Sequence, residues 1–168
     1  MNSLAEKAFL DIIREHERMI HKICNLYTSD VSEKQDLFQE IILQLWKSFK
    51  GFRNEAKIST WMYRIALNTA LTHLRRSKTK VSLSFTSFIN ANIAEENDNF
   101  DQERTNLLHN AIAKLTELEK AIVMLYLDDK SYQEMEEVLG IKQGTLRVKM
   151  NRIKEKLRQI TKTSQYGT

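Results

Sequence analysis

The chain has 168 residues and a mass of 19.8 kDa, 42% of its residues are hydrophobic, and its formal net charge is +4. This composition can bury a core, and the length suits one domain or two small domains joined by a linker. Proline is absent, glycine occurs 4 times and no run of about 18 apolar residues appears, which argues against an all-strand fold and a membrane-spanning helix and predicts an all-α, cytoplasmic protein.

Three or four helices are predicted to pack as an N-terminal domain over residues 1–76. Two begin at Ser/Thr-x-x-Glu/Gln capping boxes, Ser3 with Glu6 and Ser32 with Gln35, and Gly51 offers a C-cap for the second. A third helix is predicted from about Ser59 to Arg76. Apolar residues recur at helical spacing along them: Phe9, Ile12, Ile13, Ile20, Ile23, Tyr27, Leu37, Ile41, Leu45, Phe49, Trp61, Ile65 and Leu74.

Cys24 is the only cysteine, so an internal disulfide is impossible. His16 and His21 bring the possible metal ligands near it to only three, and His16 lies off the helical face shared by the other two. A packed thiol is therefore the favoured interpretation, and neither a metal nor a cofactor is predicted.

Residues 77–106 are rich in serine, asparagine and acidic residues and lack a sustained period, which predicts a flexible linker. Within this segment, VSLSF at residues 81–85 alternates as a short strand would. A lone strand has no partner here, so a strand is the less favoured alternative.

Four helices are predicted over residues 107–168, the middle two beginning at capping boxes formed by Thr116 with Glu119 and Ser131 with Glu134. Gly140 can adopt the left-handed conformation of a tight turn. The third and fourth helices then have helix-turn-helix spacing. The four predicted ranges are Leu107–Leu115, Glu117–Leu127, Tyr132–Leu139 and Gln143 to about Thr163.

The last predicted helix has an apolar seam with cations on both sides of it. The seam is Leu146, Met150, Ile153, Leu157 and Ile160; one flank is Arg147, Lys154 and Arg158, and the other is Lys149, Arg152 and Lys156. Opposite the seam lie Gly144, Val148 and Asn151. A helix in the major groove needs cations toward both phosphate backbones and small or hydrogen-bonding groups toward the bases, so the pattern predicts duplex DNA binding. A solvated surface around a coiled-coil seam is the alternative.

Charge is unevenly distributed along the chain. Residues 51–80 contain seven basic residues and one acidic residue, and residues 141–168 contain eight basic and one acidic. The stretch between these two blocks is acidic. This distribution predicts two separate contacts with a polyanion.

Three segments together resemble the extracytoplasmic-function group of bacterial RNA polymerase sigma factors, in the sigma-70 family. They are KQDLFQEIILQLWKSF at 34–49, FRNEAKISTWMYRIALNTALTHLRR at 52–76 and LTELEKAIVMLYLDDKSYQEMEEVLGIKQGTLRVKMNRIKEKL at 115–157. The resemblance spans about residues 9–162. It implies a sigma-two-like helical domain at 1–76 and a sigma-four-like helix-turn-helix domain at 107–168, with core RNA polymerase and promoter DNA as partners.

By this resemblance the first segment binds the clamp-helices coiled coil of the largest polymerase subunit. Leu37 and Trp46 would supply apolar anchors, and Asp36 and Glu40 would pair with basic residues. For Trp46, core packing is the alternative. The implied contacts are Asp36, Leu37, Gln39, Glu40, Gln44 and Trp46.

The second segment implies recognition of the minus-ten element as a melted strand. Aromatic rings stack on unpaired bases along a cationic groove, and the loop 53–59 would capture an unstacked base. Trp61 also fits the buried stripe, so a core role stays open for it. The implied residues are Phe52, Arg53, Lys57, Trp61, Tyr63, Arg64, Asn68, Arg75 and Arg76.

The third segment implies recognition of the minus-thirty-five element as duplex. The residues expected near bases are Lys142, Gln143, Arg147, Val148 and Asn151, and those expected on phosphates are Lys149, Arg152 and Lys154. In the family the acidic linker runs toward the RNA exit path. That position suggests a nucleic-acid mimic made of Glu95, Glu96, Asp98, Asp101 and Glu103.

Two departures from the family pattern leave the promoter sequence open. Glu136 stands where a small residue is usual, and Thr72 stands where an acidic residue often follows Asn68 by four. An anti-sigma factor is a possible further partner. No set of nucleophile, base and orienting group and no phosphate loop argues for catalysis. The competing interpretations are a free-standing helix-turn-helix regulator and a helical interaction module for acidic partners.

Overall fold

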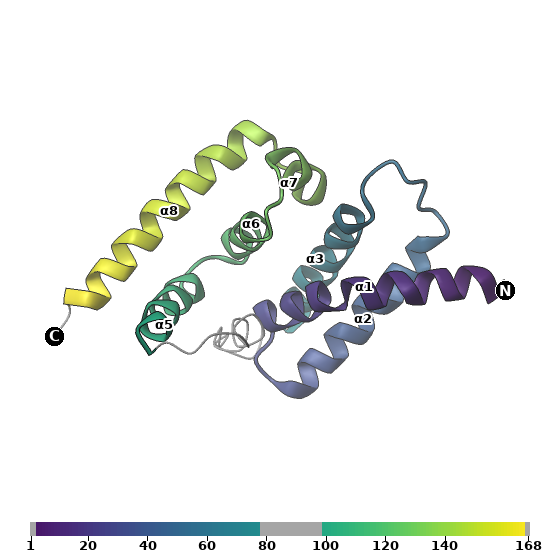
Figure 1. Ribbon diagram of the computed structural model, residues 1–168, viewed down its shortest axis with the longest axis horizontal. Coiled ribbons are helices and arrows are strands. Elements are labelled where there is room, and N and C mark those ends of the chain that lie inside the picture. Colours follow the sequence, from purple (N-terminus) through teal and green to yellow (C-terminus); the bar gives the residue numbers. More distant parts are fainter. Residues whose placement is uncertain (1–2, 78–98, 167–168) are drawn as a thin grey trace. The chain divides into compact units, whose positions relative to one another are not determined.

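The computed structural model describes residues 3–77 and 99–166, which form helices grouped into two compact units that divide between residues 82 and 83 (Figure 1). All regular structure in these ranges is helical, which confirms the all-α prediction. The strand considered at 81–85 and most of the predicted linker lie outside the described residues. The helices are α1 Ser3–Tyr27, α2 Val31–Phe49, α3 Ile58–Ser77, α5 Asn99–Ala113, α6 Glu117–Leu127, α7 Tyr132–Leu139 and α8 Gln143–Tyr166.

In the N-terminal unit each of α1, α2 and α3 packs against the other two. The predicted stripes form most of the core, while Ile12, Ile13, Phe49 and Ile65 are half-buried. Burial of one such aliphatic side chain contributes roughly 1.5–3 kcal/mol. The buried apolar residues are Phe9, Met19, Ile20, Ile23, Cys24, Leu26, Tyr27, Leu37, Ile41, Leu45, Trp61, Met62, Tyr63, Ala66, Leu67, Ala70 and Leu74.

An aromatic cluster joins all three helices of this unit. The ring centroid of Phe9 lies 4.9 Å from that of Trp46 and 5.4 Å from that of Phe49. Trp61 lies 6.4 Å from Phe49 and 4.8 Å from Phe52, which is in the loop before α3. Tilted and edge-on rings at these separations attract one another beyond simple area burial, so the cluster fixes the start of α3 against α1 and α2.

The ends of α2 differ from the prediction. Asp30, not Ser32, is the N-cap, because its extended backbone lets its carboxylate accept a hydrogen bond from the Glu33 N–H at 3.1 Å. At the other end Lys50 is the C-cap in a right-handed conformation, and Gly51 does not adopt a left-handed one. Ser3, predicted as a cap, is already the first described residue of α1.

In the C-terminal unit α5, α6 and α7 all pack against α8. α5 begins at Asn99 and not at the predicted Leu107, so the last eight residues of the predicted linker are helical. Residues such as Gln102, Glu103 and Arg104 have high helix propensity, which lets the helix extend beyond its packed part. The buried apolar residues are Ala111, Ile112, Leu115, Ala121, Ile122, Val123, Met124, Leu125, Met135, Val138, Leu146, Met150 and Ile153.

Both capping boxes predicted in this unit are confirmed. Thr116 accepts from the Glu119 N–H at 3.3 Å while the Glu119 carboxylate accepts from the Thr116 N–H at 2.9 Å. The matching distances for Ser131 and Glu134 are 3.1 and 2.9 Å. Each box satisfies two backbone donors that the helix itself leaves unpaired, so the sequence determines where α6 and α7 begin.

Gly140 closes α7 in the left-handed conformation, with φ of 69°, and its N–H donates to the Glu136 carbonyl at 2.8 Å. We expect Gly140→Ala to lower the free energy of unfolding by about 1 kcal/mol, since a Cβ disfavours this conformation even though no atom lies within 4 Å of it. Gly144→Ala is the matched control, because it adds the same methyl group in open space inside α8 and should be neutral or stabilising. Urea denaturation of both variants checks this, and equal stability of the two would contradict it.

Cys24 is buried, and this burial raises the pKa of its thiol to about 12, although the charge of Lys34 acts in the opposite direction. The prediction of a packed thiol is therefore confirmed. Within residues 3–77 and 99–166 no three His, Cys, Asp or Glu side chains gather as a metal site would require. No helix in these ranges has the length and hydropathy needed to span a bilayer.

Candidate functional site

The helix-turn-helix is present, with α7, the turn at Gly140 and α8 in the predicted order. The α8 seam is buried at Leu146, Met150 and Ile153 and becomes half-buried at Leu157 and Ile160. The buried seam therefore anchors the first half of α8 in the core, and the side of the helix opposite the seam is exposed to solvent. The exposed residues there are Gly144, Thr145, Arg147, Val148, Asn151 and Arg152. Thr145 was missed by the sequence analysis, although it lies three residues before Val148 and shares its side of the helix.

Two cations of α8 lie against tyrosine rings from neighbouring helices. The Arg147 guanidinium carbon is 5.1 Å from the ring centroid of Tyr132 in α7. The Lys154 Nζ is 4.6 Å from the ring centroid of Tyr126 in α6 and donates to its hydroxyl at 3.1 Å. These contacts restrict both side chains before any ligand arrives, because a cation is attracted to the ring face.

Lys156 has a structural partner. Its Nζ donates to a carboxylate oxygen of Glu119 at 3.0 Å, which links α8 to the start of α6. Burial alone would raise the pKa of Glu119, but the hydrogen bond from the Thr116 N–H and the ion pair with Lys156 together lower it. This lysine therefore stabilises the unit, while Lys149 and Arg152 on the same flank line a small cavity beside α6.

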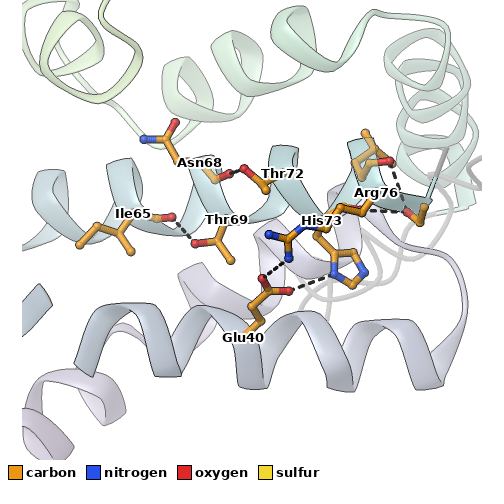
Figure 2. Close-up of polar contacts among 9 residues, drawn as sticks. Glu40, Ile65, Asn68, Thr69, Thr72, His73 and Arg76 are labelled. Carbon is orange, nitrogen blue, oxygen red and sulfur yellow. Dashed lines mark hydrogen bonds and ion pairs between the residues drawn. The ribbon is translucent and has the colours of Figure 1, made fainter. Parts of the chain in front are cut away.

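In the N-terminal unit α3 presents one polar, cationic side to solvent, which we call the α3 edge. Its residues Arg64, Asn68, Thr72, Arg75 and Arg76 recur at helical spacing and are all exposed. The Thr72 hydroxyl donates to the backbone carbonyl of Asn68 at 2.8 Å, and not to the exposed Asn68 side chain (Figure 2). Arg53 and Lys57 in the loop before α3 are exposed as well.

Trp61 and Tyr63 do not belong to this exposed edge. Their exposed fractions are 7% and 3%, so neither ring offers a face to an unpaired base in this structure. The reason is that α3 packs against both α1 and α2 and is buried around a wide arc that includes Met62 and Leu67. The burial of Trp61 favours the core role that was left open for it, and of the predicted aromatic residues only Phe52 is half-buried.

On α2 the residues Asp36, Gln39, Leu43 and Lys47 form one exposed stripe, which we call the α2 outer face. Leu37, predicted as an apolar anchor, is 0% exposed and belongs to the core in this structure. Leu43 is 49% exposed and lies on the same stripe as Asp36 and Gln39. The signal for Leu43 was its spacing of seven residues from Asp36, which places both on one side of the helix. Trp46 and Gln44 are half-buried, Trp46 within the aromatic cluster.

A polar groove of about 270 Å³ runs between α2 and α3. Glu40 lies in it and accepts hydrogen bonds from His73 Nδ1 at 3.2 Å and from Arg76 at 3.4 Å (Figure 2). Glu40, predicted as a polymerase contact, thus pairs with Arg76, predicted as a DNA contact. His73 was missed in the sequence analysis. The groove is lined by Glu40, Gln44, Ser48, Ile65, Asn68, Thr69, Thr72 and Arg76.

Few of the acidic linker residues can be placed. Glu95, Glu96 and Asp98 lie outside the described residues, whereas Asp101 and Glu103 fall within α5. Their role as a nucleic-acid mimic stays a prediction. Glu136, the departure in α7, is half-buried.

Comparison with known proteins identifies relatives of both units. The family profile for Sigma-70 region 2 matches residues 12–80, and that for Sigma-70, region 4, matches residues 105–157. The ECF RNA polymerase sigma factor SigW of Bacillus subtilis is 26% identical over 92% of this chain and 89% of its own length. The ECF RNA polymerase sigma-E factor of Escherichia coli K12 is 26% identical over 89% of this chain and 84% of its own.

A solved structure shares the fold. CnrH, determined in complex with the cytosolic domain of CnrY, superposes with a TM-score of 0.67 over 94% of this chain and 90% of that one. The sequence identity is 14%, so this likeness concerns the fold alone.

Proposed function

We propose that the two helical units recognise different elements of a promoter, because the chain belongs to the extracytoplasmic-function group of the sigma-70 family. As a sigma factor it directs RNA polymerase to promoters at the start of transcription. The N-terminal unit would bind the polymerase and the melted minus-ten strand. The C-terminal unit would read the minus-thirty-five element as duplex. The role is non-enzymatic and belongs to the cytoplasm, where polymerase acts.

One observation carries this division: exposed cationic surfaces occur on both units, the α3 edge on one and α8 on the other. A free-standing duplex regulator needs only α8. The α3 edge suits a single strand, because arginines follow the phosphates while Asn68 can hydrogen-bond to a base that pairing no longer occupies.

For the minus-ten strand we propose contacts from the loop before α3 and from the α3 edge. The arginines and Lys57 would neutralise phosphates, and half-buried Phe52 is the remaining candidate for stacking. Trp61 and Tyr63 would act indirectly by fixing α3. The proposed contacts are Phe52, Arg53, Lys57, Arg64, Asn68, Arg75 and Arg76.

For the duplex we propose that α8 enters the major groove with its exposed side. Arg147 suits the acceptor pair of guanine, Asn151 suits adenine, and Val148 can contact a thymine methyl group. Lys142 and Gln143 lie at the start of the helix, near the same bases. Lys149, Arg152 and Lys154 would bind phosphates and set the register.

Polymerase would bind the α2 outer face, with Leu43 as apolar anchor in place of Leu37. We further propose an anti-sigma factor as a second protein partner. The support is that CnrH, which has the same fold, was determined in complex with the cytosolic domain of CnrY.

Transcription in vitro by purified core polymerase on a pooled promoter library tests the function. We expect new start sites that share two upstream elements when the protein is present. Silence, combined with duplex binding and no polymerase binding, would instead support the free-standing regulator.

The double variant Asp36→Ala, Gln39→Ala should weaken polymerase binding about tenfold, since it removes two polar contacts beside Leu43. Titration of labelled core polymerase measures this. Glu15→Ala on an exposed side of α1 is the charge-matched control and should bind as the unaltered protein does. Unchanged affinity of the double variant would contradict the placement of polymerase on the α2 outer face.

A further inference from the structure

Glu40 lies between the two N-terminal surfaces that the proposed function uses. It belongs to α2, directly after Gln39 of the outer face, yet its carboxylate points across the groove to α3 (Figure 2). There it accepts from His73 at 3.2 Å and from Arg76 at 3.4 Å. One acidic side chain of α2 therefore contacts a cation of the α3 edge.

The side-chain exposures of Glu40, His73 and Arg76 suggest that the contact between Glu40 and Arg76 can be replaced by a contact with a ligand. Glu40 and His73 are largely shielded, with side-chain exposures of 26% and 21%, whereas Arg76 is 72% exposed. The Arg76 end of the contact can therefore open to solvent without disturbing the core. Among the described residues that line the groove, Glu40 is the only acidic one, so Arg76 has one carboxylate competing with any phosphate that approaches.

We propose that Glu40 is an internal counter-ion that holds Arg76 in the free protein and releases it when a ligand takes over either partner. A phosphate of the melted strand competes for Arg76, and a basic group of the polymerase competes for Glu40. Each ligand then removes an obstacle to the other, so the two binding events favour one another. This coupling rests on the proposed function of the α2 outer face and the α3 edge.

Glu40→Gln in the full chain tests the proposal without polymerase. The amide keeps the shape of the side chain and removes its charge, so Arg76 becomes available to a phosphate. Affinity for a fluorescent single-stranded oligonucleotide of mixed sequence should rise about two- to fivefold at low salt, the range expected for loss of one partly exposed ion pair. The salt dependence should also steepen by about 0.7 in log–log slope, as one more phosphate is neutralised.

Glu17→Gln is the matched control. Glu17 pairs with His21 at 3.4 Å on α1, so this variant also removes one negative charge and one carboxylate–histidine contact, but away from the α3 edge. Its effect should be smaller than that of Glu40→Gln. In an Arg76→Gln background the gain from Glu40→Gln should disappear.

Three results would overturn the proposal: unchanged or weaker oligonucleotide binding by Glu40→Gln at low salt, an equal gain from Glu17→Gln, or a gain that persists without Arg76. Circular dichroism of each variant excludes unfolding as the cause. Because transcription by the unaltered protein is tested separately, a negative result here with normal transcription would refute the counter-ion role alone. Absence of transcription would refute the proposed function itself.

Discussion

Leu37→Ala should lower the free energy of unfolding of the N-terminal unit by about 2–5 kcal/mol, the largest loss of stability expected from the substitutions considered for this unit. Leu37 is 0% exposed and lies among the residues that α1 and α3 pack against. Truncation removes buried methyl groups and leaves a cavity that the three helices can fill only partly. Since the free energy of unfolding of a small domain is roughly 5–15 kcal/mol, this substitution would remove a large part of the stability of the unit.

Leu43→Ala separates this effect from polymerase binding. The same truncation six residues later on α2 removes a leucine that is 49% exposed, so stability should change little. Polymerase affinity should fall instead. Urea denaturation and titration of core polymerase measure the two quantities. If Leu37→Ala were stable and bound polymerase poorly while Leu43→Ala behaved normally, the assignment of the two leucines would have to be reversed.

Arg147→Ala should weaken duplex binding in a sequence-dependent manner, by about 1–3 kcal/mol on a promoter carrying the preferred base and much less on one without it. Arg152→Ala should weaken binding to all duplexes alike and reduce the salt slope by about 0.9, as expected for one lost phosphate contact. Electrophoretic mobility or anisotropy titrations on matched and mismatched duplexes distinguish the two patterns.

Tyr132→Phe is the control for Arg147. It retains the ring that lies 5.1 Å from the guanidinium carbon and should therefore preserve sequence preference, whereas Tyr132→Ala should reduce it. A uniform loss from Arg147→Ala together with a sequence-dependent loss from Arg152→Ala would show that the division of α8 is the opposite of the one proposed.

Local chemistry made much of this fold predictable. The boxes at Thr116 and Ser131, the left-handed Gly140 and the apolar seam of α8 each depend on residues close together in sequence. The predicted range of α3 agrees with the structure to within one residue at each end. The exposure of Gly144, Val148 and Asn151 follows from their position opposite the seam.

The predictions differed from the structure where contacts between residues far apart in the sequence determine which side chains are buried. Leu37 and Leu43 look equally apolar, and only the packing of α2 against α1 and α3 shows which of them is buried. For Trp61 the sequence allowed either core packing or contact with a base, and its burial follows from the packing of α3 against both α1 and α2. The early start of α5 and the choice of Asp30 over Ser32 as a cap are smaller cases, in which neighbouring residues offer nearly equal alternatives.

The aromatic cluster also makes the N-terminal unit optically distinct. The chain has only two tryptophans, Trp46 and Trp61, and both belong to that cluster. Indole emission thus reports on the N-terminal unit alone, while α5 to α8 contribute only tyrosine. A shift of this emission during titration with DNA, which has no indole group, would come from one unit, without any introduced label. Melting of the N-terminal unit can likewise be followed in the intact chain, because both indoles belong to its aromatic cluster.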